Sequence, residues 1–207
     1  MRRDARWAAV LLAAALVAVA GCVSVPPSAV TTLPPPSPVP PAVSVPGVSA
    51  AAIPGVLAAV ADEGRVTYTV TLHPGQCHAR DDGRLPDPAC TPGSTDPRIT
   101  QASIATTICR AGWTATVRPP ASATDRAKRD VAYPAYGIPA ATPSELDHLV
   151  PLELGGSNDI TNLWIEVGRV PNVKDAVENR LRAEVCAGRV SLAAAQLAIA
   201  ANWETAP

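Results

Sequence analysis

Residues 145–164 read ELDHLVPLELGGSNDITNLW, and this stretch decides the fold. Charged and apolar residues alternate in its first half, which favours a strand, and residues 155–159 have the composition of a turn. Residues 163–167 predict a second strand. Residues 172–186 then carry apolar side chains at every fourth position, which is typical of a helix. The order around His148 is therefore strand, turn, strand and helix.

Asp147 and His148 form the pair of residues with the clearest chemical potential. Neighbours on a strand point to opposite faces, so the two can serve one site only at a strand end where the backbone turns. Pro151 and the glycines that follow it make such a turn credible. A carboxylate binds a hard cation such as Mg²⁺, and a neutral imidazole accepts a proton from water near pH 7. Phosphodiester hydrolysis requires both capacities.

The same stretch resembles the HNH (ββα-metal) endonuclease family. The resemblance rests on Asp-His, then Val-Pro-Leu, then Gly-Gly-Ser-Asn, and then Asn-Leu, all within residues 145–164. It implies that Asp147 binds a metal ion, that His148 is the general base, and that Asn162 orients the loop and helps to hold the histidine. A looser resemblance over residues 85–204 extends to a group of small secreted bacterial HNH proteins.

The second metal ligand is less clear, because many HNH members place a histidine or asparagine on the helix and this helix has no histidine. Asn172, Asp175 and Glu178 are candidates, and capping of the helix is the alternative role for Asn172 and Asp175. Lys174 could contact a phosphate, or could be a solvated lysine at the start of the helix. We expect one divalent cation, Mg²⁺ or Mn²⁺ ahead of Zn²⁺ or Ni²⁺.

The N-terminal part has the pattern of an export signal. Residues 1–21 begin with arginines and continue in an apolar run that is too short to span a membrane but typical of a signal peptide. The run ends in Val-Ala-Gly-Cys22, which resembles a bacterial lipobox and would make Cys22 the lipidated residue. An ordinary signal peptide with an incidental cysteine is the alternative. Residues 22–58 are rich in proline and predict a disordered tether, so the folded domain is expected at residues 59–207.

The charge balance does not favour a nucleic-acid binder. Removal of residues 1–21 takes away three arginines and one aspartate, so the net charge falls from −1 to −3. A strongly basic surface is therefore absent. Five basic residues lie between Arg110 and Arg129, and they form either a local basic face or an ordinary solvated surface.

The remaining four cysteines suit an exported protein with two disulfides, for which three pairings are possible. We favour Cys77–Cys90, because the residues between them suit a closed loop, and this leaves Cys109–Cys186. Zinc is the competing explanation for the first pair, with His73 and His78 as further ligands, although the spacing matches no standard zinc finger.

Together these features predict an α+β fold: a ββα-metal motif (core 145–186) embedded in a small, mainly helical domain behind a proline-rich tether. Outside the motif we expect a strand at 65–72 and short helices at 100–110 and 124–131, with a last helix capped by Ser191. The predicted function is an extracytoplasmic, membrane-anchored and monomeric endonuclease that acts on nucleic acid. The alternative is an inactive HNH scaffold that serves as a binding module on the cell surface.

Overall fold

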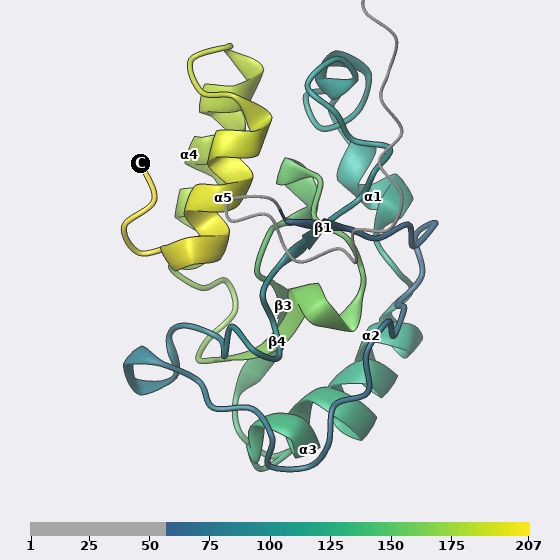
Figure 1. The fold of residues 1–207 in the computed structure, drawn as a ribbon, viewed down its shortest axis with the longest axis vertical. Coiled ribbons are helices and arrows are strands. Elements are labelled where there is room, and N and C mark those ends of the chain that lie inside the picture. Colours follow the sequence, from purple (N-terminus) through teal and green to yellow (C-terminus); the bar gives the residue numbers. More distant parts are fainter. Residues whose placement is uncertain (1–56) are drawn as a thin grey trace, which may run out of the picture. The chain divides into compact units, whose positions relative to one another are not determined.

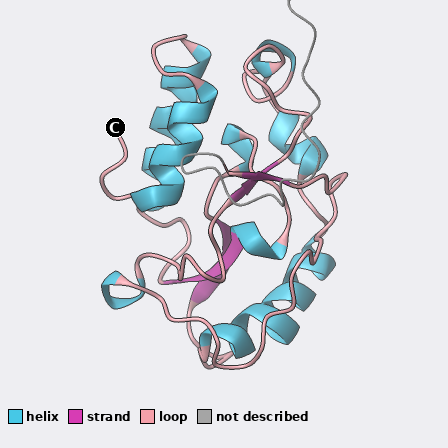
Figure 2. Ribbon diagram, in the orientation of Figure 1, coloured by secondary structure: helices cyan, strands magenta, loops and turns pink. Residues whose placement is uncertain are grey.

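The computed structural model describes residues 57–207, which form a small mixed α/β domain with two short sheets (Figures 1 and 2). The predicted signal peptide, Cys22 and all but the last two residues of the predicted tether lie outside the described residues. In chain order the elements are β1 (Ala58–Ala59), η1 (Asp81–Gly83), β2 (Ser94–Thr95), η2 (Ile104–Thr106), α1 (Trp113–Val117), α2 (Ala121–Ala127), η3 (Lys128–Ala132), α3 (Tyr133–Tyr136), β3 (Ser144–His148), η4 (Leu152–Leu154), η5 (Ile160–Asn162), β4 (Leu163–Val167), α4 (Lys174–Cys186) and α5 (Leu192–Asn202).

The central feature is the antiparallel pair β3 and β4, followed directly by α4, in the order that the sequence predicts. Residue pairing places Glu145 opposite Glu166, Asp147 opposite Trp164, and His148 opposite Leu163. Because side chains alternate along a strand, Glu145, Asp147 and Glu166 share one face of this hairpin. His148 is the last residue of β3 and belongs to the other face.

Helices α4 and α5 lie side by side and build the larger core (Figure 1). Both start with a side-chain cap: Asn172 Oδ1 accepts from the backbone N–H of Lys174 at 2.8 Å, and Ser191 Oγ accepts from that of Ala194 at 3.3 Å. Of the apolar positions predicted from the four-residue spacing, Leu181 and Val185 are fully buried, Val177 is partly buried, and Val173 is 74% exposed. These contacts hold α4 against the loop that follows β3.

A continuous helical segment, from α2 through η3 to α3, packs against the hairpin, and η3 contacts both β3 and β4. The sequence predicts only residues 124–131 of this segment as a helix. Pro134 stands in the first turn of α3, where its missing N–H costs little.

The strand predicted at residues 65–72 is absent, which corrects that expectation. Only Thr67 makes a bridge, to Asp159, and the apolar residues Tyr68 and Val70 are 49% and 43% exposed. On the polar side of the alternation, Thr67 and Thr69 donate hydroxyl hydrogen bonds to the Asp159 carboxylate at 2.8 and 2.7 Å. The helix predicted at 100–110 is likewise reduced to the single turn η2.

Candidate metal and general-base site

The shared face of the hairpin gathers three carboxylates. Oxygen atoms of Glu145, Asp147 and Glu166 all lie within 4.8 Å of one another, and we call these residues the carboxylate cluster. Asp147 and Glu166 are buried, with exposed fractions of 7% and 6%. Such a group of hard oxygen donors could hold a metal ion.

Glu166 supplies an independent sign that the carboxylate cluster is incomplete. Its Oε2 is the one fully buried side-chain nitrogen or oxygen in residues 57–207 that has no hydrogen-bond partner. Burial, together with the neighbouring charge of Asp147, raises the pKa of Glu166 to about 8. Either a proton or a cation would satisfy this carboxyl group, and a buried acceptor without either is costly.

Lys174 is the counter-charge that the protein itself provides. Its side chain is fully buried, and its ammonium lies 2.8 Å from Asp147 Oδ2 and also binds Glu178. It donates a further hydrogen bond to the backbone carbonyl of His148 at 2.8 Å. Although burial favours the neutral amine, the two carboxylates raise the pKa of Lys174 above its ordinary value. The solvated position considered for Lys174 is therefore wrong, because its side chain is fully buried. A contact between Lys174 and a phosphate stays a prediction.

Asn172 and Asp175, two of the three helix candidates for the second metal ligand, do not join the carboxylate cluster. Asn172 caps α4 and donates from its amide to Glu145 at 2.9 Å, so it contacts the cluster only from outside. Asp175 accepts from the backbone N–H of Asn172 at 3.2 Å, in the reciprocal arrangement of a capping box. The structure thus gives both residues the capping role and brings Glu145 and Glu166 to Asp147 in their place.

His148 is held on the other face of the hairpin by an asparagine that the sequence analysis overlooked. Its Nε2 lies 2.9 Å from Asn158 Oδ1, and the residue is 7% exposed. Nδ1 has no partner among the described residues, yet it is not one of their fully buried unpaired atoms, so it retains contact with solvent. Burial lowers the pKa of His148 below its ordinary value, despite opposing contributions from Asn158 and Asp147.

Asn162 fixes the loop between the strands rather than touching the histidine. Its amide donates to the carbonyls of Val150 and Ser157 at 2.9 and 2.8 Å, and its oxygen accepts from the N–H of Val150 at 2.9 Å. Only a glycine fits at position 156, because a Cβ there would lie 1.7 Å from the carbonyl oxygen of Val150. The hydrogen bonds of Asn162 and the close approach of Gly156 to Val150 fix the loop after β3, and so the position of His148 at the end of that strand.

One cavity of about 610 Å³ joins the two faces. Asp147, Glu145 and His148 all line it, because the chain turns immediately after β3. Two members of the predicted basic stretch, Arg118 and Lys128, line it as well. Glu166 is not among the lining residues, so its carboxyl group approaches the cluster from behind the cavity.

Both predicted disulfides, Cys77–Cys90 and Cys109–Cys186, are formed. The zinc alternative is therefore wrong for the first pair, because Cys77 and Cys90 are bonded to each other. His73 and His78 are exposed. Two disulfides are typical of an oxidising, extracytoplasmic compartment. None of the helices within residues 57–207 has the length and apolar character required to cross a membrane.

The fold and the site together define a small disulfide-bonded α/β domain with a carboxylate-rich cavity and one histidine in it. The chain matches no family model, no curated protein and no solved structure. Its function therefore has to be argued from the site itself.

Proposed function

We propose that this protein is an extracytoplasmic, metal-dependent endonuclease of the HNH type that hydrolyses nucleic-acid phosphodiester bonds. One observation carries the proposal. A single cavity is lined by His148, whose Nδ1 is unpaired, and by Asp147, whose carboxylate belongs to a cluster suited to a cation. The order β3, β4, α4 around this cavity supports the resemblance of residues 145–164 to the HNH motif.

In the proposed reaction His148 is the general base. Since Nε2 is engaged by Asn158, the proton of the attacking water passes to Nδ1. The water oxygen forms a bond to phosphorus, the bond from phosphorus to the 3′ oxygen breaks, and that oxygen takes a proton from solvent. The lowered pKa of His148 keeps the ring neutral, and so able to accept the proton, at neutral pH.

Asp147, with Glu145 and Glu166, would hold the divalent cation. The unpaired oxygen of Glu166 and the all-oxygen donor set fit a hard ion such as Mg²⁺ or Mn²⁺ better than a zinc site. When bound, the ion would supply positive charge that offsets the charge developing on the phosphate and the leaving oxygen. Lys174 forms an ion pair with Asp147 and directs its carboxylate toward α4.

Arg118 and Lys128 would contact the phosphates that flank the scissile bond, because both line the cavity and phosphate contacts position a nucleic acid. The two disulfides support action outside the cytoplasm, where the proposed lipid anchor at Cys22 would hold the domain at a membrane as a monomer.

The direct test is nicking of supercoiled plasmid by the purified protein in Mg²⁺ or Mn²⁺, with EDTA controls. We expect His148→Ala to lower the rate about 10²- to 10⁴-fold, the range for loss of a general base. His78→Ala is the matched control, since His78 is exposed and lies outside the cavity. Equal nicking by His148→Ala and the parent would rule out the mechanism.

A binding module on the same scaffold is the second candidate, and the ion pair between Lys174 and Asp147 favours it. Here the ammonium, rather than a metal ion, would permanently neutralise Asp147. Metal binding separates the two candidates: a cation site raises the melting temperature as Mn²⁺ is added, by mass action, and a permanently neutralised scaffold gives no shift.

A further inference from the structure

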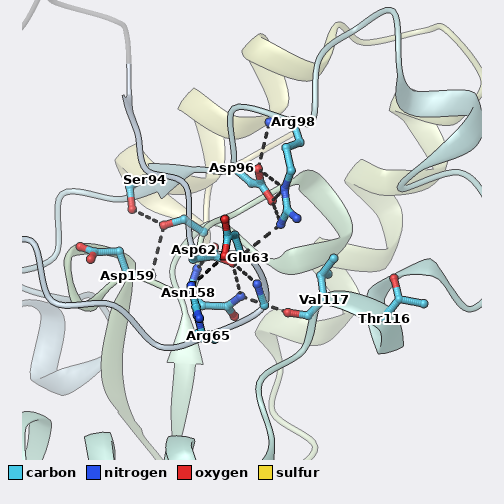
Figure 3. Close-up of polar contacts among 12 residues, drawn as sticks. Asp62, Glu63, Arg65, Ser94, Asp96, Arg98, Thr116, Val117, Asn158 and Asp159 are labelled. Atoms are coloured by element: carbon cyan, nitrogen blue, oxygen red, sulfur yellow. Dashed lines mark hydrogen bonds and ion pairs between the residues drawn. The ribbon is translucent and has the colours of Figure 1, made fainter.

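Asp62 lies 96 residues before Asn158 in the chain, yet it holds that asparagine directly. Its side chain is 2% exposed. One carboxylate oxygen accepts from the backbone N–H of Asn158 at 2.7 Å, and the other accepts from the Asn158 amide at 3.0 Å, as Figure 3 shows. The first residues of the described chain are thus attached to the middle of the motif.

The orientation of the Asn158 amide follows from these contacts. Its nitrogen donates to Asp62 and also to the backbone carbonyl of Val117, both at 3.0 Å. A carboxylate and a carbonyl can only accept, so the NH₂ group must face them and the amide oxygen must face His148. The alternative orientation, with the amide rotated by half a turn, would leave three acceptors in contact without a hydrogen.

An acceptor at Asn158 Oδ1 in turn requires a proton on His148 Nε2. The neutral ring carries one proton, so Nδ1 presents a lone pair toward solvent. We infer that Asp62 is a positioning residue: by fixing the Asn158 amide it holds His148 in the Nε2–H form, with Nδ1 as the basic atom. The catalytic part of this inference rests on the proposed function, whereas the part about the ring proton does not.

Position 62 requires a carboxylate rather than an isosteric amide. Every group around it is a donor: the N–H of Gly64 at 2.7 Å, both nitrogens of Asn158, and the guanidinium of Arg98 at 3.8 Å. In Asp62→Asn the new NH₂ would face one of these donors. Relief of that repulsion allows the Asn158 amide to rotate, and its oxygen is then no longer fixed toward His148.

Asp96 offers a matched control. It is also buried, at 3% exposed, and it binds the same arginine, with Arg98 Nε at 2.9 Å, but it makes no contact with Asn158. Asp96→Asn therefore removes a comparable buried carboxylate while leaving the contacts between Asp62 and Asn158 intact (Figure 3). Any general loss of stability in this region affects both variants.

The experiment is a nitrogen-detected NMR spectrum of the imidazole groups in the full chain, where His73 and His78 are the only other histidines. We expect the parent and Asp96→Asn to show His148 as one Nε2–H form. Asp62→Asn and Asn158→Ala should show exchange between the two forms. Asn158→Ala keeps the test valid if Asp62→Asn does not fold. An Nδ1–H ring in the parent, or an unchanged Nε2–H ring in both variants, would overturn the inference.

Kinetics supply a second readout once nicking has been measured for the parent. We expect Asp62→Asn to lower kcat about 10- to 100-fold, because the basic atom is misplaced, with KM nearly unchanged. Asp96→Asn should leave kcat close to that of the parent. A parent without any nicking would reject the proposed function alone, since the NMR result reports on the ring proton without substrate.

Discussion

Asp147 and His148 are neighbours in β3, but their side chains lie on opposite faces of the strand and have different surroundings. The Asp147 face is crowded with charge: three carboxylates, the buried ammonium of Lys174 and the carboxylate of Glu178. On the His148 face the ring contacts an uncharged amide, Asn158, whose own donors have acceptors in Asp62 and Val117. The first arrangement is unbalanced without a further cation, whereas the second is complete.

This difference shows how one strand end can perform two tasks. A metal site benefits from an excess of buried negative charge, because the ion then repays the cost of burying it. A general base benefits from the reverse, a fixed neutral surrounding that keeps its pKa low and its proton on a chosen nitrogen. The turn after His148 brings both environments to one cavity.

Replacing one key side chain on each face should give the largest and most distinct effects. His148→Ala is expected to lose about 10²- to 10⁴-fold in nicking rate while binding Mn²⁺ as the parent does. Asp147→Asn is expected to lose both activity and Mn²⁺ affinity. Nicking assays paired with Mn²⁺ titration calorimetry measure this, and a large loss of Mn²⁺ binding in His148→Ala would show that the two faces are not separate.

Lys174→Met tests the charge balance of the Asp147 face. Removing the one buried ammonium leaves Asp147 and Glu178 unpaired, so the free energy of unfolding should fall by about 3–5 kcal/mol. Part of this loss should be recovered when Mn²⁺ is added. Urea unfolding with and without Mn²⁺ measures it, with the half-buried Lys128→Met as the control. An equal loss of stability in both lysine variants would contradict the role of Lys174 as the counter-charge of Asp147 and Glu178.

Glu166→Gln sharpens the definition of the metal site. We expect Mn²⁺ affinity to fall about 10- to 100-fold, because the unpaired oxygen of Glu166 would no longer carry charge. Glu153→Gln is the matched control, since Glu153 lines the cavity but lies outside the carboxylate cluster. Unchanged calorimetric affinity in Glu166→Gln would remove Glu166 from the site.

The last prediction concerns the effect of pH on the metal-free protein. Burial raises the pKa of Glu166 to about 8 and that of Glu178 to about 7, so the folded protein retains protons that the unfolded chain releases above pH 4.5. Stability should therefore decline between pH 5 and pH 8.5 in EDTA, as these two groups lose their protons in the folded state. Urea unfolding at both pH values checks the sign. A rise in stability over this range would contradict it.

Local patterns in the sequence predicted the hairpin and α4, because strand, turn and helix signals there agree with the packing. Glu166 had a visible signal that went unused, since it is a charge within the apolar strand 163–167. The error at 65–72 has the opposite cause: an alternating pattern does not say which side is buried, and here Thr67 and Thr69 face the buried acceptor Asp159.

The role of Asp62 could not have been predicted from the sequence. Nothing in its neighbourhood resembles a functional motif, and its role depends on a tertiary contact with Asn158 across 96 residues. Lys174 was misplaced for a related reason, because a lysine in the first turn of a helix is usually solvated. Lys174 is buried because the start of α4 packs against the end of β3.

The most direct measurement is anomalous diffraction from crystals of the His148→Asn protein soaked with Mn²⁺ and a short duplex. We expect one Mn²⁺ peak within about 2.0–2.4 Å of Asp147 and Glu166 oxygens, with a backbone phosphate between the ion and residue 148. A peak bound elsewhere, or a phosphate that contacts neither the ion nor residue 148, would contradict the convergence of the two faces on one reaction centre.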